Sequence, residues 1–130
     1  MIRALPLVLP LVLVACGEAP PRQPVAGPEA RKAVDAATAA YADCVTNNTL
    51  KVAPGGVPGT IVSEAMKACA PAREALAEKV MAFHHLGHPK FTPNQLRVVA
   101  AASIDQIEPE IRADAVAAYI TRSSPNAKAE

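Results

Sequence analysis

The chain has 130 residues, a net charge of +1 and a hydrophobic fraction of 51%, so it is long enough for one small domain. Its lysines and arginines form no cluster that could replace phosphate counterions, which argues against nucleic acid as a partner. The chain has two tyrosines, two phenylalanines and no tryptophan, and alanine supplies much of the apolar fraction. Because alanine favours helix and buries little area, we expect a thin helical core.

Residues 1–15 have the pattern of a secretory signal peptide, in which Arg3 precedes an apolar run that ends at Ala15. The run is too short to span a bilayer, which needs about 20 apolar residues. Pro6 and Pro10 would weaken a spanning helix, and they also argue against a buried N-terminal helix.

A cysteine follows directly in the sequence Leu13-Val14-Ala15-Cys16, which resembles the lipobox of bacterial lipoproteins. The resemblance implies cleavage before Cys16, acylation of its thiol and of the new N-terminus, and the lipid bilayer as a partner. Several acyl chains give stable anchoring where one would be marginal. An ordinary signal peptide followed by a chance cysteine is the alternative interpretation.

Residues 16–28 are rich in proline, so we expect an extended tether between the membrane and the domain. Gly17 occupies the position where aspartate tends to retain a lipoprotein at the inner membrane. The resemblance therefore implies the periplasmic face of the outer membrane. The same motif would suit the exported cell surface of a Gram-positive bacterium.

With Cys16 assigned to lipid, Cys44 and Cys69 remain, and an exported compartment permits them to form one disulfide. A loop of about 25 residues would restrict the unfolded chain by roughly 3–4 kcal/mol. Two buried free thiols or a metal site are the alternatives.

Helical periodicity predicts an all-α domain over residues 29–122, followed by a disordered tail over 123–130. The first helix covers residues 29–47, where Asn47-Asn48 suits a helix end. Its apolar face contains Val34, Ala37, Tyr41, Cys44 and Val45.

A glycine- and proline-rich loop over residues 50–59 precedes a second helix, which Thr60 can cap. Cys69 lies on the apolar stripe of this helix, and Pro71 should kink or split it. The apolar stripe of the second helix contains Ile61, Ala65, Cys69, Ala72, Leu76, Val80 and Phe83.

Thr92-Pro93-Asn94-Gln95 is a strong start for a third helix, which Pro109 should bend or break. Its apolar set is Leu96, Val99, Ile104, Ile107, Ile111, Ala115 and Tyr119. The prediction is a small three-helix bundle with a Cys44–Cys69 disulfide, or four to five shorter helices if the prolines break them.

All three histidines lie in the stretch MAFHHLGHP, residues 81–89. Met81, His84, His85 and His88 could bind copper, and the imidazoles alone would suit zinc or nickel. The plainer interpretation is a polar helix end without a cofactor, since histidine suits the negative end of the helix dipole. Gly87 and Pro89 favour ending the helix before His88.

The carboxylate pairs Glu74/Glu78 and Glu108/Glu110 are the remaining candidates for chemistry. Arg73 and Lys79 flank the first pair, which indicates a solvated helix face. No known catalytic motif is present. We therefore expect a membrane-tethered, non-enzymatic module that binds an envelope protein of unknown identity. The alternative is a periplasmic metal-binding protein that uses the histidine cluster.

Overall fold

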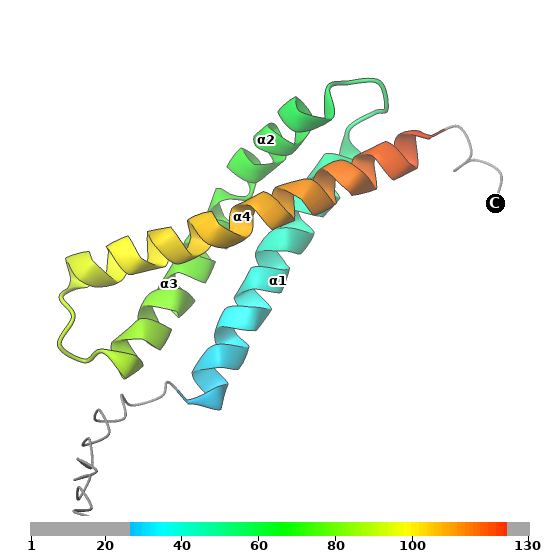
Figure 1. Ribbon diagram of the computed structural model, residues 1–130. Helices are drawn as coiled ribbons and strands as arrows, with labels where there is room; N and C mark the ends of the chain where they lie inside the picture. Colours follow the sequence, from blue (N-terminus) through cyan, green and yellow to red (C-terminus); the bar gives the residue numbers. More distant parts are fainter. Residues whose placement is uncertain (1–26, 125–130) are drawn as a thin grey trace, which may run out of the picture.

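The computed structural model describes residues 27–124, which form four helices and no strand. These are α1 (Pro28–Lys51), α2 (Pro58–Ala68), α3 (Ala70–Gly87) and α4 (Pro93–Ser123). In Figure 1, α2 and α3 follow one another along one side of the bundle, and α4 runs lengthwise across α1 and α3. The predicted all-α bundle is confirmed.

The predicted signal peptide, the lipobox with Cys16, most of the tether and residues 125–130 lie outside the described residues. None of the helices between residues 27 and 124 combines the length and the apolar character that crossing a bilayer would require.

Proline at the first helical positions helps to set where the helices begin. The α4 start is the predicted capping box: the Thr92 hydroxyl accepts the Gln95 N–H, and the Gln95 side chain accepts the Thr92 N–H. The start predicted at Thr60 is wrong by a few residues. Helix α2 begins at Pro58, whose fixed φ and missing N–H suit the first helical position.

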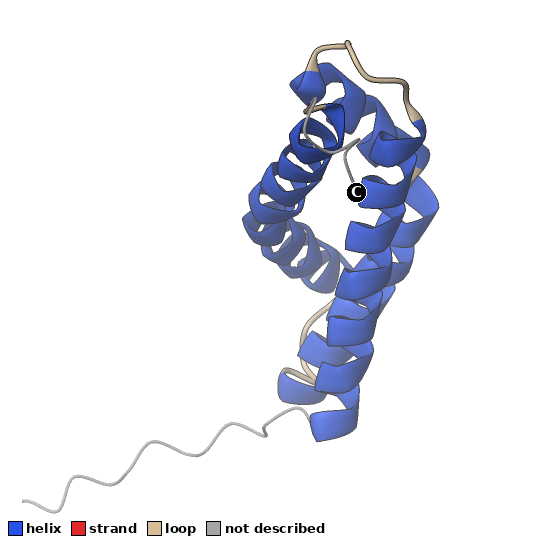
Figure 2. Cartoon of the chain, turned by 90° about the vertical axis from the view of Figure 1, so that its right-hand side faces the viewer, coloured by secondary structure: helices blue, strands red, loops and turns tan. Residues whose placement is uncertain are grey.

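The first helix is longer than predicted, because α1 continues past Asn47-Asn48 to Lys51. The Asn48 side chain donates a 2.9 Å hydrogen bond to the Cys44 carbonyl one turn earlier. Thr49 is completely buried, so packing against the neighbouring helices extends α1 beyond its local stop signal. The next loop is correspondingly short, and the loops after α1 and after α3 lie at opposite ends of the bundle (Figure 2).

The two internal prolines act differently. Pro71 lies in the first turn of α3, and the chain breaks at Cys69, which separates α2 from α3. Pro109 is exposed in the interior of α4, which remains one helix of 31 residues. The predicted second helix is therefore two helices, and the predicted third helix is unbroken.

The disulfide between Cys44 and Cys69 is confirmed, with an S–S distance of 2.07 Å. It joins α1 to the point where α2 gives way to α3. The amide nitrogen of Asn48 lies 3.3 Å from the sulfur of Cys69 and 3.5 Å from that of Cys44.

The hydrophobic core runs along the inside of all four helices and uses most of the predicted apolar faces. Val62 and Ala100 are buried although they were not predicted, whereas Ile61 and Phe83 are only half-buried. The buried hydrophobic residues are Tyr41, Val45, Val62, Ala65, Cys69, Leu76, Val80, Ala100, Ile104, Ile111, Ala115 and Tyr119.

Candidate functional site

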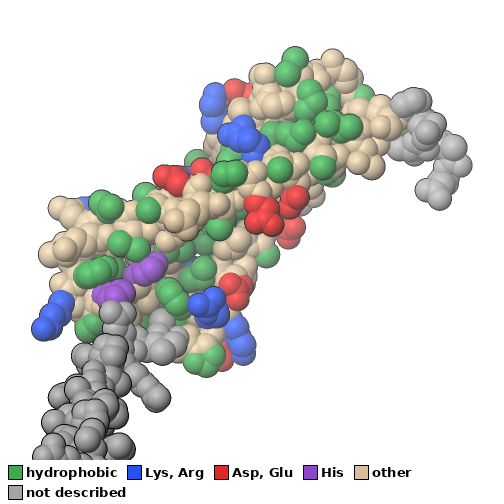
Figure 3. Space-filling view, in the orientation of Figure 1, with side chains coloured by type: hydrophobic (Ala, Val, Ile, Leu, Met, Phe, Trp, Pro, Cys, Tyr) green, Lys and Arg blue, Asp and Glu red, His purple; other side chains and the backbone are tan. Residues whose placement is uncertain are grey.

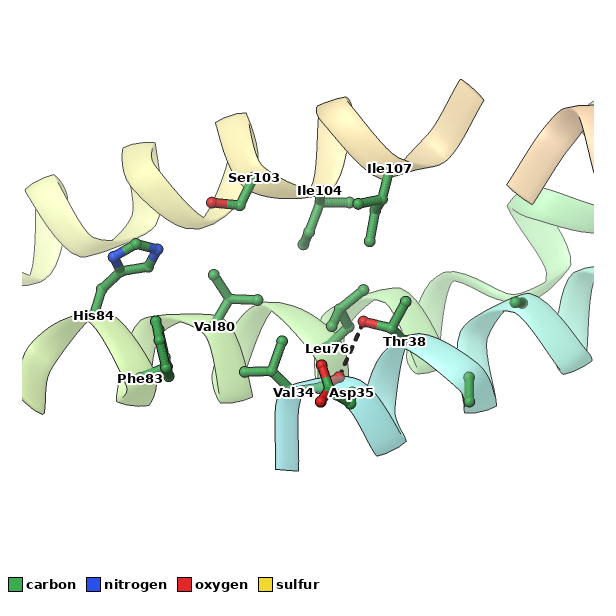
Figure 4. Close-up of a pocket in the computed structure, with 12 residues that line it drawn as sticks. Val34, Asp35, Thr38, Leu76, Val80, Phe83, His84, Ser103, Ile104 and Ile107 are labelled. Carbon is green, nitrogen blue, oxygen red and sulfur yellow. Dashed lines mark hydrogen bonds between the residues drawn. The ribbon is translucent and has the colours of Figure 1, made fainter. Parts of the chain in front are cut away.

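The best candidate for a functional site is an apolar groove of about 570 Å³ between α1, α3 and α4 (Figure 4). Leu76 and Val80 of α3 contribute to the groove, and Ile104 and Ile107 of α4 point toward them from the opposite side. Its volume lies within the range of roughly 300–1,000 Å³ that is typical of small-molecule sites. The lining residues are Val34, Asp35, Thr38, Ala39, Ala42, Leu76, Val80, Phe83, His84, Ser103, Ile104 and Ile107.

The two hydroxyl groups that line the groove already have hydrogen-bond partners. The Thr38 hydroxyl donates to the Val34 carbonyl at 3.0 Å, shown as the dashed line in Figure 4. The Ser103 hydroxyl donates to the Val99 carbonyl at 2.9 Å. Both protons are therefore used within their own helices, and the walls behave as apolar surface toward a ligand.

His84 and Asp35 are the titratable groups among the lining residues. Burial, and secondarily the nearby His88, lower the pKa of His84 below its ordinary value of 6.5. The imidazole is thus mainly neutral at pH 7. In Figure 4 the His84 ring points from α3 toward α4 at one end of the groove.

Positive charge reaches this same end from the first turns of α1. The guanidinium carbon of Arg31 lies 5.5 Å from the centre of the Phe83 ring, which lines the groove. This distance is typical of a cation–π contact. In Figure 3 the histidines lie among hydrophobic side chains at the end of the molecule where α1 begins.

A charged network joins the same three helices next to the other end of the groove. Glu108 of α4 accepts hydrogen bonds from the Tyr41 hydroxyl of α1 at 3.0 Å and from Arg73 Nε of α3 at 2.7 Å. Burial, followed by the hydrogen bond and charge of Glu108, raises the pKa of Tyr41 to about 12. The hydrogen bond from Arg73 to Glu108 raises the pKa of Arg73.

Sequence reasoning missed this network. It grouped Glu108 with Glu110, but Glu110 is exposed while Glu108 is half-buried between Tyr41 and Arg73. The available signal was Tyr41 itself, because a tyrosine on a buried helix face needs a partner for its hydroxyl. Glu74 and Glu78 are both exposed, as predicted for a solvated face.

The predicted metal ligands are spread over different surfaces. Helix α3 ends at Gly87, before His88, as its glycine and proline predicted. The His88 ring stacks on Phe91 at 4.6 Å and lies 6.5 Å from the His84 ring. His85 is exposed, and Met81 lines a separate shallow hollow between α3 and α4.

Among residues 27–124, no group of three or more histidine, cysteine, aspartate or glutamate side chains is arranged to hold a metal ion. The structure therefore brings His84 and His88 near each other, without the other two predicted ligands.

Comparisons with protein-family models, with curated proteins and with solved structures find no match to this chain.

Proposed function

We propose that this chain is a lipid-anchored protein of the bacterial cell envelope that acts as a non-enzymatic binding module. The observation that carries the proposal is the open apolar groove between α1, α3 and α4. Its hydroxyl groups are used within their own helices, which favours binding of an apolar partner over chemistry on it. The partner is another component of the envelope.

The sequence that precedes α1 supports a membrane anchor attached at the end of the bundle where Arg31 lies. Cys16 precedes Pro28, the first residue of α1, by twelve residues. A fully extended chain of that length spans about 40 Å. An acylated Cys16 would therefore hold the groove within a short distance of the bilayer surface. By the lipobox resemblance this surface is the periplasmic face of the outer membrane, or the exported cell surface in a Gram-positive bacterium.

Cell fractionation tests the anchor. The full chain and its Cys16→Ser variant are expressed with their own leader, and the mass of the mature N-terminus is measured. We expect the native chain in the membrane fraction with an acylated Cys16 at its N-terminus. The variant should lack the lipid mass.

Two substitutions at Gly17 serve as matched controls, because both keep the acceptor thiol. Gly17→Ala should leave the location unchanged, whereas Gly17→Asp should shift the protein to the inner membrane. An N-terminus without acyl groups in the native chain would refute the anchor.

The alternative function, metal binding, is favoured by the proximity of His84 and His88. Elemental analysis of the protein purified without an affinity tag tests it, beside the His84→Ala/His88→Ala variant. About one copper, zinc or nickel ion per chain that disappears in the variant would put metal binding first.

A further inference from the structure

We infer that the groove between α1, α3 and α4 binds a long-chain fatty acid, with the hydrocarbon tail inside and the carboxylate at the Arg31 end. The inference rests on the proposed function in one respect: the tether would keep the groove beside a bilayer, where such molecules concentrate. The binding chemistry itself depends only on residues of the bundle.

The walls suit a hydrocarbon chain better than an extended peptide. A peptide strand brings backbone N–H and C=O groups, and these need partners when they are buried. The hydroxyls of Thr38 and Ser103 are already bonded to their own helices, so they offer no free proton to such a strand. A hydrocarbon chain requires no such partners.

The charges near the groove determine which end of the groove binds the carboxylate of the ligand. Arg31 lies over Phe83 at the end where α1 begins, and His84 lines the groove at the same end. A guanidinium and an imidazole N–H can both donate hydrogen bonds to a carboxylate. Asp35 lies one helical turn beyond Arg31 and would repel a carboxylate placed deeper in the groove. The carboxylate is therefore favoured at the Arg31 end.

The groove, with a volume of about 570 Å³, holds the tail in a bent conformation, because its length along α1 is shorter than an extended sixteen-carbon chain. The groove follows α1 from Val34 to Ala42, a rise of roughly 12 Å at about 1.5 Å per residue. Two alanines, Ala39 and Ala42, leave space that larger side chains would fill. Next to Ala42 and Ile107, the bond between Tyr41 and Glu108 ties α1 to α4. The end of the tail thus lies near the Tyr41–Glu108 hydrogen bond.

Photo-crosslinking in washed membranes tests the inference on the full chain. Membranes that contain the protein are incubated with a photoreactive fatty acid, illuminated and digested, and the labelled residues are identified by mass spectrometry. We expect label on groove residues of α1, α3 and α4, reduced at least fivefold by excess palmitate. Label confined to other surfaces, or label that palmitate does not displace, would overturn the inference. A second copy or another protein seated in the groove would give that result.

A matched pair of substitutions tests the cavity. Ala39 and Ala40 are both exposed, but only Ala39 lines the groove. We expect Ala39→Trp to abolish the groove label and Ala40→Trp to retain it. Equal labelling of the two variants would contradict the inference. Far-UV circular dichroism, which measures helix content, checks that each variant has folded.

A second pair tests the carboxylate and remains informative if Ala39→Trp does not fold. Arg31→Glu should raise the palmitate concentration needed for displacement at least fivefold, with no effect on displacement by hexadecanol. Lys32→Glu is the control, because Lys32 is exposed and pairs with Glu29 at 3.2 Å. Equal effects of the two variants would refute recognition of the carboxylate.

The outcomes for anchor and groove are separable. An unacylated Cys16 with groove label intact would refute the proposed anchor alone. An intact anchor with no groove label would refute the fatty-acid site alone.

Discussion

Reduction of the Cys44–Cys69 bridge should destabilise the bundle strongly. The two cysteines are 25 residues apart, and a loop of that length constrains the unfolded chain by about 3.5 kcal/mol on the loop-entropy relation. The total stability of a small domain is about 5–15 kcal/mol, so this loss removes a large share of it. Cys69 is only 1% exposed, and its reduced thiol can stay in the core as a small apolar group.

The assay is urea unfolding of residues 17–130 at 25 °C, followed by far-UV circular dichroism with and without a phosphine reductant. We expect the free energy of unfolding to fall by about 3.5 kcal/mol. The denaturant slope should rise, because the unfolded chain without its cross-link exposes more surface. A Cys44→Ala/Cys69→Ala variant is the control, and the reductant should not affect it. A loss below about 1 kcal/mol in the native chain would refute the loop-entropy argument.

The side chains of Thr49, Tyr41 and His84 give four further predictions. The Thr49 hydroxyl is buried without a partner, so Thr49→Val should stabilise the bundle by about 1–2 kcal/mol in urea unfolding, whereas the bonded control Thr38→Val should give no such gain. Tyr41→Phe should cost about 1.5–3 kcal/mol, because it removes a hydrogen bond to the charged Glu108. The pKa of Tyr41 is raised from 10.0 to about 12, so its hydroxyl ionises in the unfolded state before it does in the folded state. The free energy of unfolding should therefore fall as pH rises above 10.0. An equal fall in the Tyr41→Phe variant would contradict this. The pKa of His84 is lowered, so His84 is protonated in the unfolded state before it is in the folded state, and the free energy of unfolding should fall as pH drops through 6.5. The His84→Gln variant should lose this part of the pH dependence. Equal pH dependence of His84→Gln and His85→Gln would contradict the reasoning.

Features set by local chemistry were predictable from the sequence. The capping box at Thr92 involves residues within one turn, and its residue types fit few other structures. The disulfide followed from the assignment of Cys16 to lipid, which left Cys44 and Cys69 as the only pair. Both cysteines were also predicted on apolar helix faces. In the structure Cys44 packs against the core and Cys69 belongs to it, but Cys69 lies at the break between α2 and α3.

Features set by packing were not predictable in the same way. Pro71 and Pro109 both interrupt a helical pattern, and only the structure shows that the first begins a new helix while the second does not. Asn47-Asn48 suited a helix end, but α1 continues to Lys51, because Thr49 is buried against the neighbouring helices. Local signals in both cases were overridden by contacts between helices.

The groove and its charged network depend on how the helices cross. Tyr41 and Glu108 are 67 residues apart, so their contact exists only because α4 crosses α1 there. Whether the alanines of α1 pack closely against α4 or leave a groove depends on the angle between the two helices. The periodicity of a single sequence defines each apolar face but not this angle.

The position of the bridge at the junction of α2 and α3 decides which part of the bundle can move. Cys69 is fixed to α1, while α2 and α3 are separate helices on either side of it. Cys69 is thus a fixed point at the start of α3. Any movement of α3 relative to α1 that widens the groove is therefore constrained at Cys69, where the disulfide fixes the start of α3. One cysteine pair therefore cross-links the bundle and also fixes the end of α3 that lies away from His84.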